Sequence, residues 1–257
     1  MTVLQNEEAK DRAATLRNRA RLSANKNLLF WYRELYQDQF KDYPNPRTLS
    51  ILEVGSGTSP LKQFFPTVVT SDVLDMDYFD LVFDCHDIDK LDAIKNESLD
   101  VITLTNVLHH LKSPIVFLNR AANKLRPGGK VIATEPFFSL LSTPIFKYLH
   151  HEPVDFQVAE PELKNVYGPL ASANIALPWL IFYERRDWLE RLNEKYHIDR
   201  LSAHPFTALS YMVTGGISRK LPIPGLLYRG MFAIDLVLSR FLPRLCASFF
   251  TLTMTRR

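Results

Sequence analysis

Cysteine is scarce in this chain of 257 residues, which contains only Cys85 and Cys246. One possible pair is too few for a disulfide framework, and neither residue belongs to a close Cys pair of the kind that builds a zinc knuckle. The sequence therefore predicts a protein of a reducing compartment. We expect it in the cytoplasm, or at the inner face of the membrane.

Long uncharged hydrophobic runs are also missing. No stretch of about 18 apolar residues lacks a charge, so the sequence predicts no membrane-spanning helix. The first residues are charged rather than apolar, which argues against a secretory signal. At 46% hydrophobic residues, the chain is nevertheless long enough to bury a full core, and we expect one α/β domain with additions.

Excess charge is confined to one end. The net charge is +3, but residues 217–257 carry seven basic side chains against one acid, Asp235. The rest of the chain is slightly acidic. The basic residues therefore gather in an apolar tail, and the sequence shows no nucleic-acid-binding signature.

The most informative stretch runs from Leu49 to Pro60. The apolar residues Ile51, Leu52 and Val54 predict a strand buried on both faces. Two glycines, Gly55 and Gly57, follow at once and allow a tight turn that can approach a ligand closely. Pro60 suits the first turn of a helix. Strand, glycine loop and helix start together predict a nucleotide-type pocket.

An acid, Glu53, precedes the first glycine by two residues. This Glu-x-Gly-x-Gly pattern resembles motif I of the class I S-adenosylmethionine (SAM) dependent methyltransferases. The resemblance implies that Glu53 helps to hold the methionine amino end of SAM, and that the loop Gly55-Ser56-Gly57 lies against the cofactor. Ser59 stands where many members carry a third glycine.

Two further acids are candidates for the nucleoside. Asp72 follows an apolar pair, Val68 and Val69, and an acid at this distance after the first strand can accept hydrogen bonds from both ribose hydroxyls. Asp75 is the alternative if the strand ends later. By resemblance to the same family, Asp87 would accept from the adenine amine and Ile88 would touch the ring.

A fourth strand is predicted over Val101 to Leu104, followed by Thr105, Asn106 and a histidine pair. This segment also resembles the class I family, in which this strand often ends near an Asn; the resemblance implies that Asn106 lies at the cofactor. Either His109 or His110 could remove a proton from an acceptor hydroxyl. Since adjacent residues on a helix face different ways, we expect only one of them in the pocket. The alternative is that both serve packing.

Four motifs in the family's order, over residues 49–136, imply the fold. We expect a Rossmann-like sheet of seven strands, mostly parallel with the last strand antiparallel, and helices on both faces. The predicted elements after the histidines are a helix over 114–125, a turn at Arg126-Pro-Gly-Gly, and strands over 131–136, 197–201 and 247–254. The catalytic domain would span 45–257.

Residues 1–44 predict a helical extension that continues to about Phe40. It could pack on the edge of the domain. By resemblance to similar methyltransferases it could instead close over the cofactor as a lid, bringing Trp31, Tyr32 or Arg33 near it.

An insertion over residues 137–186 combines aromatic and aliphatic residues with a polar cluster. We interpret it as an acceptor lid whose polar edge is His150, His151, Glu152 and Asp155. These side chains could hydrogen-bond the substrate or support the insertion itself. We predict no metal site, because adjacent histidines point apart and no distant partner completes a ligand set.

The last helix, over 226–242, is apolar nearly all round. It could be buried against the sheet or in a subunit contact. Alternatively, the segment 219–244 could lie at a membrane surface, where its basic residues would meet anionic headgroups.

These observations predict a methyltransferase with SAM as cofactor. The acceptor would be a small molecule: a glycan, lipid or natural-product intermediate methylated on a hydroxyl. An amphiphilic acceptor would suit the apolar, basic tail. A non-catalytic SAM-fold binding protein is the alternative. A short-chain dehydrogenase is disfavoured because no Tyr-x-x-x-Lys occurs, and nucleic-acid methylation because no Asn-Pro-Pro-Tyr motif follows the fourth strand.

Overall fold

The structure is a computed structural model that describes residues 3–164, 166, 168, 172–203, 208–217 and 221–257. Two basic residues of the segment expected at a membrane, Arg219 and Lys220, lie outside these ranges. Among the described residues, no helix is both long and apolar enough to cross a membrane.

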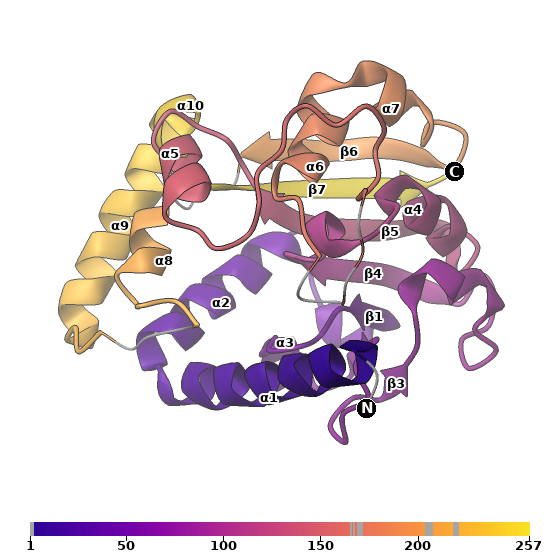
Figure 1. Ribbon diagram of the computed structural model, residues 1–257, viewed down its shortest axis with the longest axis horizontal. Helices are drawn as coiled ribbons and strands as arrows, with labels where there is room; N and C mark the ends of the chain where they lie inside the picture. Colours follow the sequence, from indigo (N-terminus) through magenta and orange to yellow (C-terminus); the bar gives the residue numbers. More distant parts are fainter. Residues whose placement is uncertain (1–2, 165, 167, 169–171, 204–207, 218–220) are drawn as a thin grey trace.

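A seven-stranded sheet forms the centre of the described chain (Figure 1). Its strands are β1 (Ile51–Val54), β2 (Val69–Asp72), β3 (Leu81–Val82), β4 (Leu99–Thr105), β5 (Leu125–Pro136), β6 (Tyr196–Ala203) and β7 (Phe249–Arg256). They lie in the order β3-β2-β1-β4-β5-β7-β6. Only β7 runs antiparallel to its neighbours, β5 and β6. The predicted fold class is confirmed.

The chain changes direction across the sheet at β1. This strand pairs in parallel with β2 on one side and with β4 on the other. In open parallel sheets, the crevice beyond the carboxyl ends of two such strands is where ligands bind. The loops after β1 and β4 are therefore the place to look for a site.

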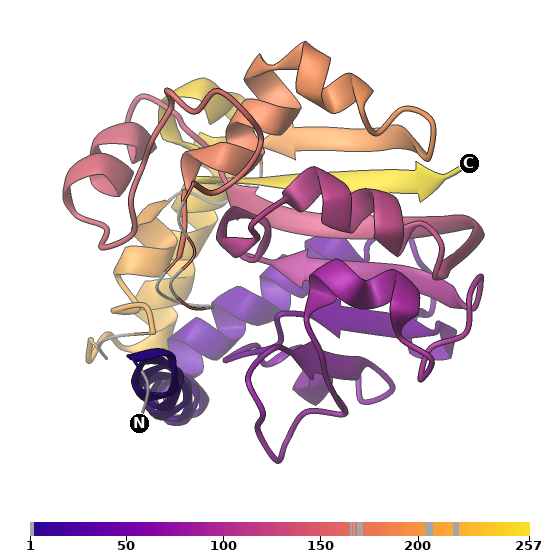
Figure 2. The same ribbon diagram turned by 45° about the vertical axis from the view of Figure 1, so that its right-hand side comes forward.

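Helices cover both faces of the sheet (Figures 1 and 2). They are α1 (Val3–Ala24), α2 (Lys26–Gln39), α3 (Leu61–Phe64), α4 (Pro114–Ala121), α5 (Ser142–Tyr148), α6 (Ala176–Trp179), α7 (Arg186–Glu190), α8 (Ala208–Met212), α9 (Gly225–Phe241) and α10 (Pro243–Cys246). Short helical turns are η1 (Pro46–Thr48), η2 (Cys85–Lys90), η3 (Leu108–His110) and η4 (Leu180–Glu184).

Alternate residues of the strands enter two separate cores. On one face Ile51 and Ile132 pack with α2 and α9. On the other, Leu52 and Val131 pack with α4, α6 and α7. Strands that are buried on both faces read as continuous apolar runs, which is why they were recognisable in the sequence.

The N-terminal segment is two helices rather than one. Asn25 separates α1 from α2, and its side chain accepts a hydrogen bond from Leu28 N at 3.2 Å as the N-cap of α2. Its amide also donates to Thr214 O at 2.9 Å. An Asn in a run of good helix formers thus ends one helix and starts the next, because its side chain satisfies an otherwise unpaired backbone group.

Two boundaries near β5 also differ from expectation. The helix predicted over 114–125 ends at Ala121, and the turn predicted at Arg126 to Gly129 lies within β5. The register of β4 and β5 shifts between Leu99 and Val101, so these residues form an irregular start of the strand. Gly129 is needed there, because a Cβ would lie 2.9 Å from Leu99 O.

Candidate active site

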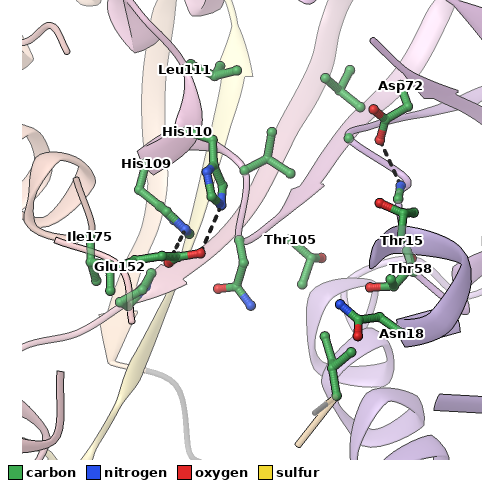
Figure 3. Close-up of a pocket in the computed structure, with 18 of the residues that line it drawn as sticks. Thr15, Asn18, Thr58, Asp72, Thr105, His109, His110, Leu111, Glu152 and Ile175 are labelled. Carbon is green, nitrogen blue, oxygen red and sulfur yellow. Dashed lines mark hydrogen bonds and ion pairs between the residues drawn. The ribbon is translucent and has the colours of Figure 1, made fainter. Parts of the chain in front are cut away.

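A continuous cavity of about 1460 Å³ opens at the carboxyl ends of β1, β2 and β4. One wall carries the glycine loop and Asp72, and the opposite wall carries His109, His110 and Glu152 (Figure 3). Thr105, at the end of β4, lies between them. The predicted cofactor and acceptor regions therefore share one space.

The glycine loop is shaped by close backbone approach. Gly55 has φ +71°, and a Cβ there would lie 2.5 Å from Val107 Cγ2 in the loop after β4. Gly57 donates its N–H to Asp72 Oδ2 at 2.9 Å. Both glycines line the cavity, so the turn exposes backbone to whatever the cavity holds.

Asp72 lies where the sequence predicted, at the end of β2 and in the cavity wall. Besides Gly57 N, its carboxylate accepts from Leu74 N at 3.0 Å, which fixes its orientation. Burial raises the pKa of this carboxyl. The alternative candidate, Asp75, is exposed and is not among the residues that line the cavity.

Glu53 lies behind the cavity wall rather than in it. The residue is 2% exposed, and its carboxylate accepts hydrogen bonds from Ser56 Oγ at 2.8 Å and from Ser59 Oγ at 2.5 Å. Ser59 in turn is 2.8 Å from Tyr36 Oη, and both of these residues line the cavity. Burial raises the pKa of Glu53 to about 7, although the two serine hydrogen bonds lower it. Glu53 and Ser56 thus support the wall that Ser59 and Tyr36 present.

Asn106 lines the cavity in a conformation that is rare outside glycine, with φ +57°. Its N–H donates to Thr134 O at 2.8 Å. Its side-chain Oδ1 is buried and has no hydrogen-bond partner within the described part of the chain. A buried acceptor of this kind favours a ligand that brings a donor, such as an amino group.

The structure does not bring Asp87 or Ile88 to the cavity. Asp87 is exposed and pairs with Lys90 Nζ at 2.7 Å, while Ile88 is fully buried in the core. Asp84 and Cys85, three positions earlier in each case, line the cavity instead. The chain enters η2 directly after β3, so the acid at the strand end faces the cavity and the later one turns away.

The N-terminal helices form part of the cavity wall. Thr15 and Asn18 of α1 face the glycine loop in Figure 3, and Tyr32 of α2 also lines the space. The other two residues considered for a lid lie elsewhere: Trp31 is buried in the core, and Arg33 pairs with Glu34. No sequence signal singled out Thr15 or Asn18, because α1 lacks a clear apolar face.

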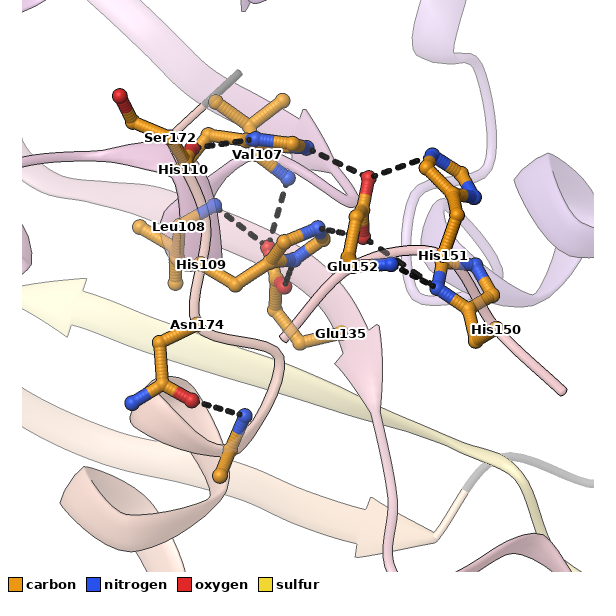
Figure 4. Close-up of polar contacts among 11 residues, drawn as sticks. Val107, Leu108, His109, His110, Glu135, His150, His151, Glu152, Ser172 and Asn174 are labelled. Carbon is orange, nitrogen blue, oxygen red and sulfur yellow. Dashed lines mark hydrogen bonds and ion pairs between the residues drawn. The ribbon is translucent and has the colours of Figure 1, made fainter. Parts of the chain in front are cut away.

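His109 is held by Glu135, a buried acid near the end of β5 that sequence reasoning overlooked. Its Nδ1 lies 2.6 Å from Glu135 Oε2, and the other carboxylate oxygen accepts from Val107 N and Leu108 N at 2.8 and 2.7 Å (Figure 4). An acid inside an otherwise apolar strand was the available signal, since buried carboxylates need partners. Glu135 therefore fixes both the turn η3 and the ring of His109.

His110 occupies the same cavity as its neighbour. Its Nδ1 donates to Ser172 O, 2.9 Å away, and its ring centroid lies 4.3 Å from that of His109. The Nε2 atoms of both rings face the carboxylate of Glu152, each at 3.4 Å from one oxygen (Figure 4). The expectation that only one of the pair faces the pocket is wrong, because η3 is a 3₁₀ turn whose two rings lie side by side.

The three groups have strongly perturbed acidities. Burial alone would lower the pKa of His109, but Glu135 and Glu152 raise it to about 10. Burial and the neighbouring His109 lower the pKa of His110 to about 4. Burial would raise the pKa of Glu152, but the facing His109 and His110 lower it to about 2. Such opposed shifts within one cluster are typical of functional sites.

The insertion contributes part of its predicted polar edge. His150, His151 and Glu152 line the cavity, and both histidines lie within 4 Å of the Glu152 carboxylate, at 3.8 and 3.7 Å. Asp155 does not take part. Its side chain accepts from Gln157 N at 2.8 Å, and its backbone is bonded to Asn174, which makes it a structural residue of the insertion.

A Rossmann-like sheet that ends in an antiparallel strand, with a glycine loop and an acid at the end of β2 in one cavity, defines the class I methyltransferase architecture. A family model described as a methyltransferase domain matches residues 10–196, most of the chain. The chain therefore belongs to the SAM-dependent methyltransferases, and SAM is its cofactor. The comparison with curated proteins gives no match.

Several solved structures are similar to this chain. A Haloferax volcanii complex between the Trm112 methyltransferase activator and a methyltransferase matches at a TM-score of 0.50 and 10% identity, over 95% of this chain and 96% of that chain. A SAM-dependent methyltransferase from Archaeoglobus fulgidus matches at 0.46 and 15%, over 87% and 94%. The N-methyltransferase NodS from Bradyrhizobium japonicum, with S-adenosyl-L-homocysteine (SAH), matches at 0.44 and 11%, over 96% and 98%.

Proposed function

We propose that this protein transfers the methyl group of SAM to a hydroxyl of a small amphiphilic molecule. One observation carries the proposal: the glycine loop with Asp72 and the cluster of His109, His110 and Glu152 are opposite walls of the same cavity. A methyl donor on one wall and a polar acceptor group on the other would meet within it, and such positioning is the main contribution of a protein to this reaction.

The residues of the first wall fit the cofactor. Asp72 would take the ribose hydroxyls, and the loop Gly55 to Gly57 would lie against the methionine end. The unpaired Oδ1 of Asn106 would accept from the amino group. Asp84 at the end of β3 would take the adenine amine, the role that the sequence assigned to Asp87. Glu53 and Ser56 would act indirectly, through Ser59 and Tyr36.

When bound, SAM supplies an electrophilic methyl group: the new C–O bond forms as the C–S bond breaks, and the electron pair stays on sulfur. The acceptor hydroxyl must also lose its proton. In the metal-free protein we propose that His110 Nε2 accepts this proton, because Nδ1 donates to Ser172 O and leaves Nε2 directed into the cavity. Glu152 would hold the acceptor beside it, and His150 and His151 would line the entrance.

An apolar rim favours an amphiphilic acceptor. Leu149, Met212 and Leu221 are exposed and also line the cavity. Nearby, Leu140 and Leu141 bond through their backbone to Arg244 and Leu245 of α10, so this rim continues toward α9. An aliphatic part of the acceptor could lie on these side chains while its hydroxyl reaches the histidines. The helices α1 and α2 would act as the lid over the cofactor end.

We also propose that the protein contacts a membrane surface through the outer face of α9. Arg229 and Arg240 are exposed on this helix. Its exposed apolar side chains are Leu226, Leu227, Ile234, Val237 and Phe241. An apolar stripe with basic residues is typical of a helix that lies at an anionic lipid surface. Co-sedimentation with anionic vesicles should fall for Phe241→Glu and stay unchanged for Val82→Glu, an exposed apolar residue of β3. Equal binding by both variants would contradict the assignment.

Calorimetric titration with SAH tests the cofactor part. Binding in the micromolar range should be lost in Asp72→Ala and kept in the matched control Asp75→Ala. SAM turnover, followed as SAH release, should then depend on added hydroxyl-bearing lipids or glycans. A folded protein that binds no SAH would overturn the proposal, and SAH binding without turnover for any such acceptor would favour a non-catalytic binding protein.

A further inference from the structure

The cluster opposite the glycine loop has the geometry of a metal site. One ring nitrogen of His109, one of His110 and a carboxylate oxygen of Glu152 lie within 4.8 Å of one another, and the Nε2 atom of each ring faces the carboxylate. Each nitrogen is 3.4 Å from the nearest oxygen, longer than the range of about 2.7 to 3.2 Å for an N–H···O hydrogen bond. Ligands of a tetrahedral zinc ion, at bonds of about 2.0 to 2.1 Å, lie about 3.3 Å apart.

Both rings are oriented as metal-binding histidines are. Metal-ligating imidazoles usually donate the other ring N–H to a carboxylate or a backbone carbonyl, which fixes the tautomer and directs the free lone pair at the ion. His109 Nδ1 is paired with the Glu135 carboxylate at 2.6 Å, and His110 Nδ1 with Ser172 O at 2.9 Å. The two acceptors come from different elements, and each leaves an Nε2 atom directed at Glu152 (Figure 4).

This arrangement requires positive charge between the three groups. The Glu152 carboxylate, on a side chain that is only 15% exposed, faces two ring nitrogens, and its charge would be uncompensated without a proton or a cation between them. A single proton can bridge one nitrogen to the carboxylate, but it leaves the second lone pair facing an oxygen. A divalent cation bound by all three groups satisfies them together.

We propose that His109, His110 and Glu152 bind a divalent transition-metal ion of the zinc type. Two imidazoles and one carboxylate are a known catalytic zinc ligand set, in which the remaining position is open. Imidazole ligands favour zinc and its neighbours over magnesium. From the sequence we expected no metal, because adjacent histidines should point apart and no distant partner completed a ligand set. The structure supplies that partner for Glu152: His109 and His110 lie more than forty positions earlier in the chain, and both rings face its carboxylate.

The open position of the ion would face the cavity, which all three ligands line. An acceptor hydroxyl bound there would lose its proton to solvent water more readily, because coordination lowers the pKa of a bound hydroxyl. In the metal-bound protein the ion would thus replace His110 as the group that activates the acceptor. This catalytic role rests on the proposed function, whereas binding of the ion does not.

Zinc binding can be measured on the full chain without a histidine tag. The protein is freed of metal with a chelator and titrated with Zn²⁺ against a competing chromophoric indicator, and with Mg²⁺ alone in parallel. We expect one equivalent of Zn²⁺ to bind, and Mg²⁺ to bind at least 100-fold more weakly. Co²⁺ added in place of Zn²⁺ should give the visible absorption of a histidine-bound site.

Two variants identify the site. Glu152→Gln and His110→Ala should each weaken Zn²⁺ binding at least tenfold and leave SAH binding intact. Glu162→Gln is the matched control, because Glu162 lines the same cavity but bonds Ser113 Oγ instead. His86→Ala controls for a second cluster of possible ligands, Asp84, Cys85 and His86.

Failure of stoichiometric Zn²⁺ binding in the wild-type protein would overturn the inference, and so would binding that Glu152→Gln leaves unchanged. Binding abolished by His86→Ala alone would assign the ion to the other cluster and equally contradict the proposal. SAH binding is measured on the same samples. A protein that binds SAH but not Zn²⁺ would refute the metal site while leaving the methyltransferase proposal in place.

Discussion

His109 Nδ1 lies 2.6 Å from Glu135 Oε2, and both side chains are almost fully buried. The same carboxylate accepts from the backbone of Val107 and Leu108. Glu135 therefore holds the loop after β4 in place and orients the ring of His109, whose Nε2 faces Glu152.

Replacing this acid should be costly. Glu135→Gln keeps an oxygen for the backbone but removes the charge that faces His109, and breaking a buried pair costs about 3 to 5 kcal/mol. Urea denaturation should show this loss in the free energy of unfolding. Glu162→Gln, an exposed control, should stay within about 0.5 kcal/mol of the wild-type protein. A similar free energy of unfolding for the two variants would contradict the assigned role of Glu135.

Gly128 is a matched control for a substitution at Gly55 in the glycine loop. Both have positive φ, +71° and +76°, but a Cβ would clash with Val107 only at Gly55 and would meet nothing within 4 Å at Gly128. Backbone strain should cost each alanine variant about 1 to 2 kcal/mol. Gly55→Ala should lose more than that, and should also lose SAH affinity, because Val107 or the loop must move. Equal losses of stability and unchanged SAH binding in both variants would rule out this close approach as the reason for Gly55.

Asp84 and Asp87 are the two candidates for the acid that accepts from the adenine amine. Only Asp84 lines the cavity, so Asp84→Asn should weaken SAH binding about 3- to 10-fold, the value of one hydrogen bond. Asp87→Asn should bind SAH as the wild-type protein does, since this carboxylate pairs with Lys90. Calorimetry decides between them. The reverse order of affinities would restore the assignment made from the sequence.

Glu53 should make stability depend on pH. Its pKa is raised from 4.5 to about 7 by burial, so between these values the folded state holds a proton that the unfolded state releases. The contribution of Glu53 to the free energy of unfolding therefore falls as the pH rises from about 4.5 to 7. Glu53→Gln cannot titrate, so its stability relative to the wild-type protein should rise over this interval. Thermal denaturation at pH 5 and pH 8 measures this relative stability. If the stability of Glu53→Gln relative to the wild-type protein is the same at both pH values, or lower at pH 8, the carboxyl ionises normally.

The sequence predicted what depends on neighbouring residues. The strand, the two glycines and Asp72 were recognisable because apolar runs, turn residues and strand ends are local patterns. The sequence-based assignment was wrong where two residues of the same type lay close together and the backbone conformation decided which one faced the cavity. Asp84 and Asp87 are both acids after β3, and only the start of η2 decides which one faces the cavity.

The acceptor wall could not be derived in this way. His109, His110, Glu135 and Glu152 come from the loop after β4, from β5 and from the insertion, and they meet only in the folded chain. Rules for helical spacing also misjudged the histidine pair, because η3 is too short to turn one ring away. Buried polar residues in apolar surroundings, such as Glu135, are the sequence signal that could have pointed to this wall.

A crystal structure of the complex with SAH tests the central claim most directly. We expect the ribose at Asp72, the amino group at Asn106, and the sulfur directed across the cavity toward His110 and Glu152. SAH bound with its sulfur turned away from this cluster, or bound outside the cavity, would contradict the account.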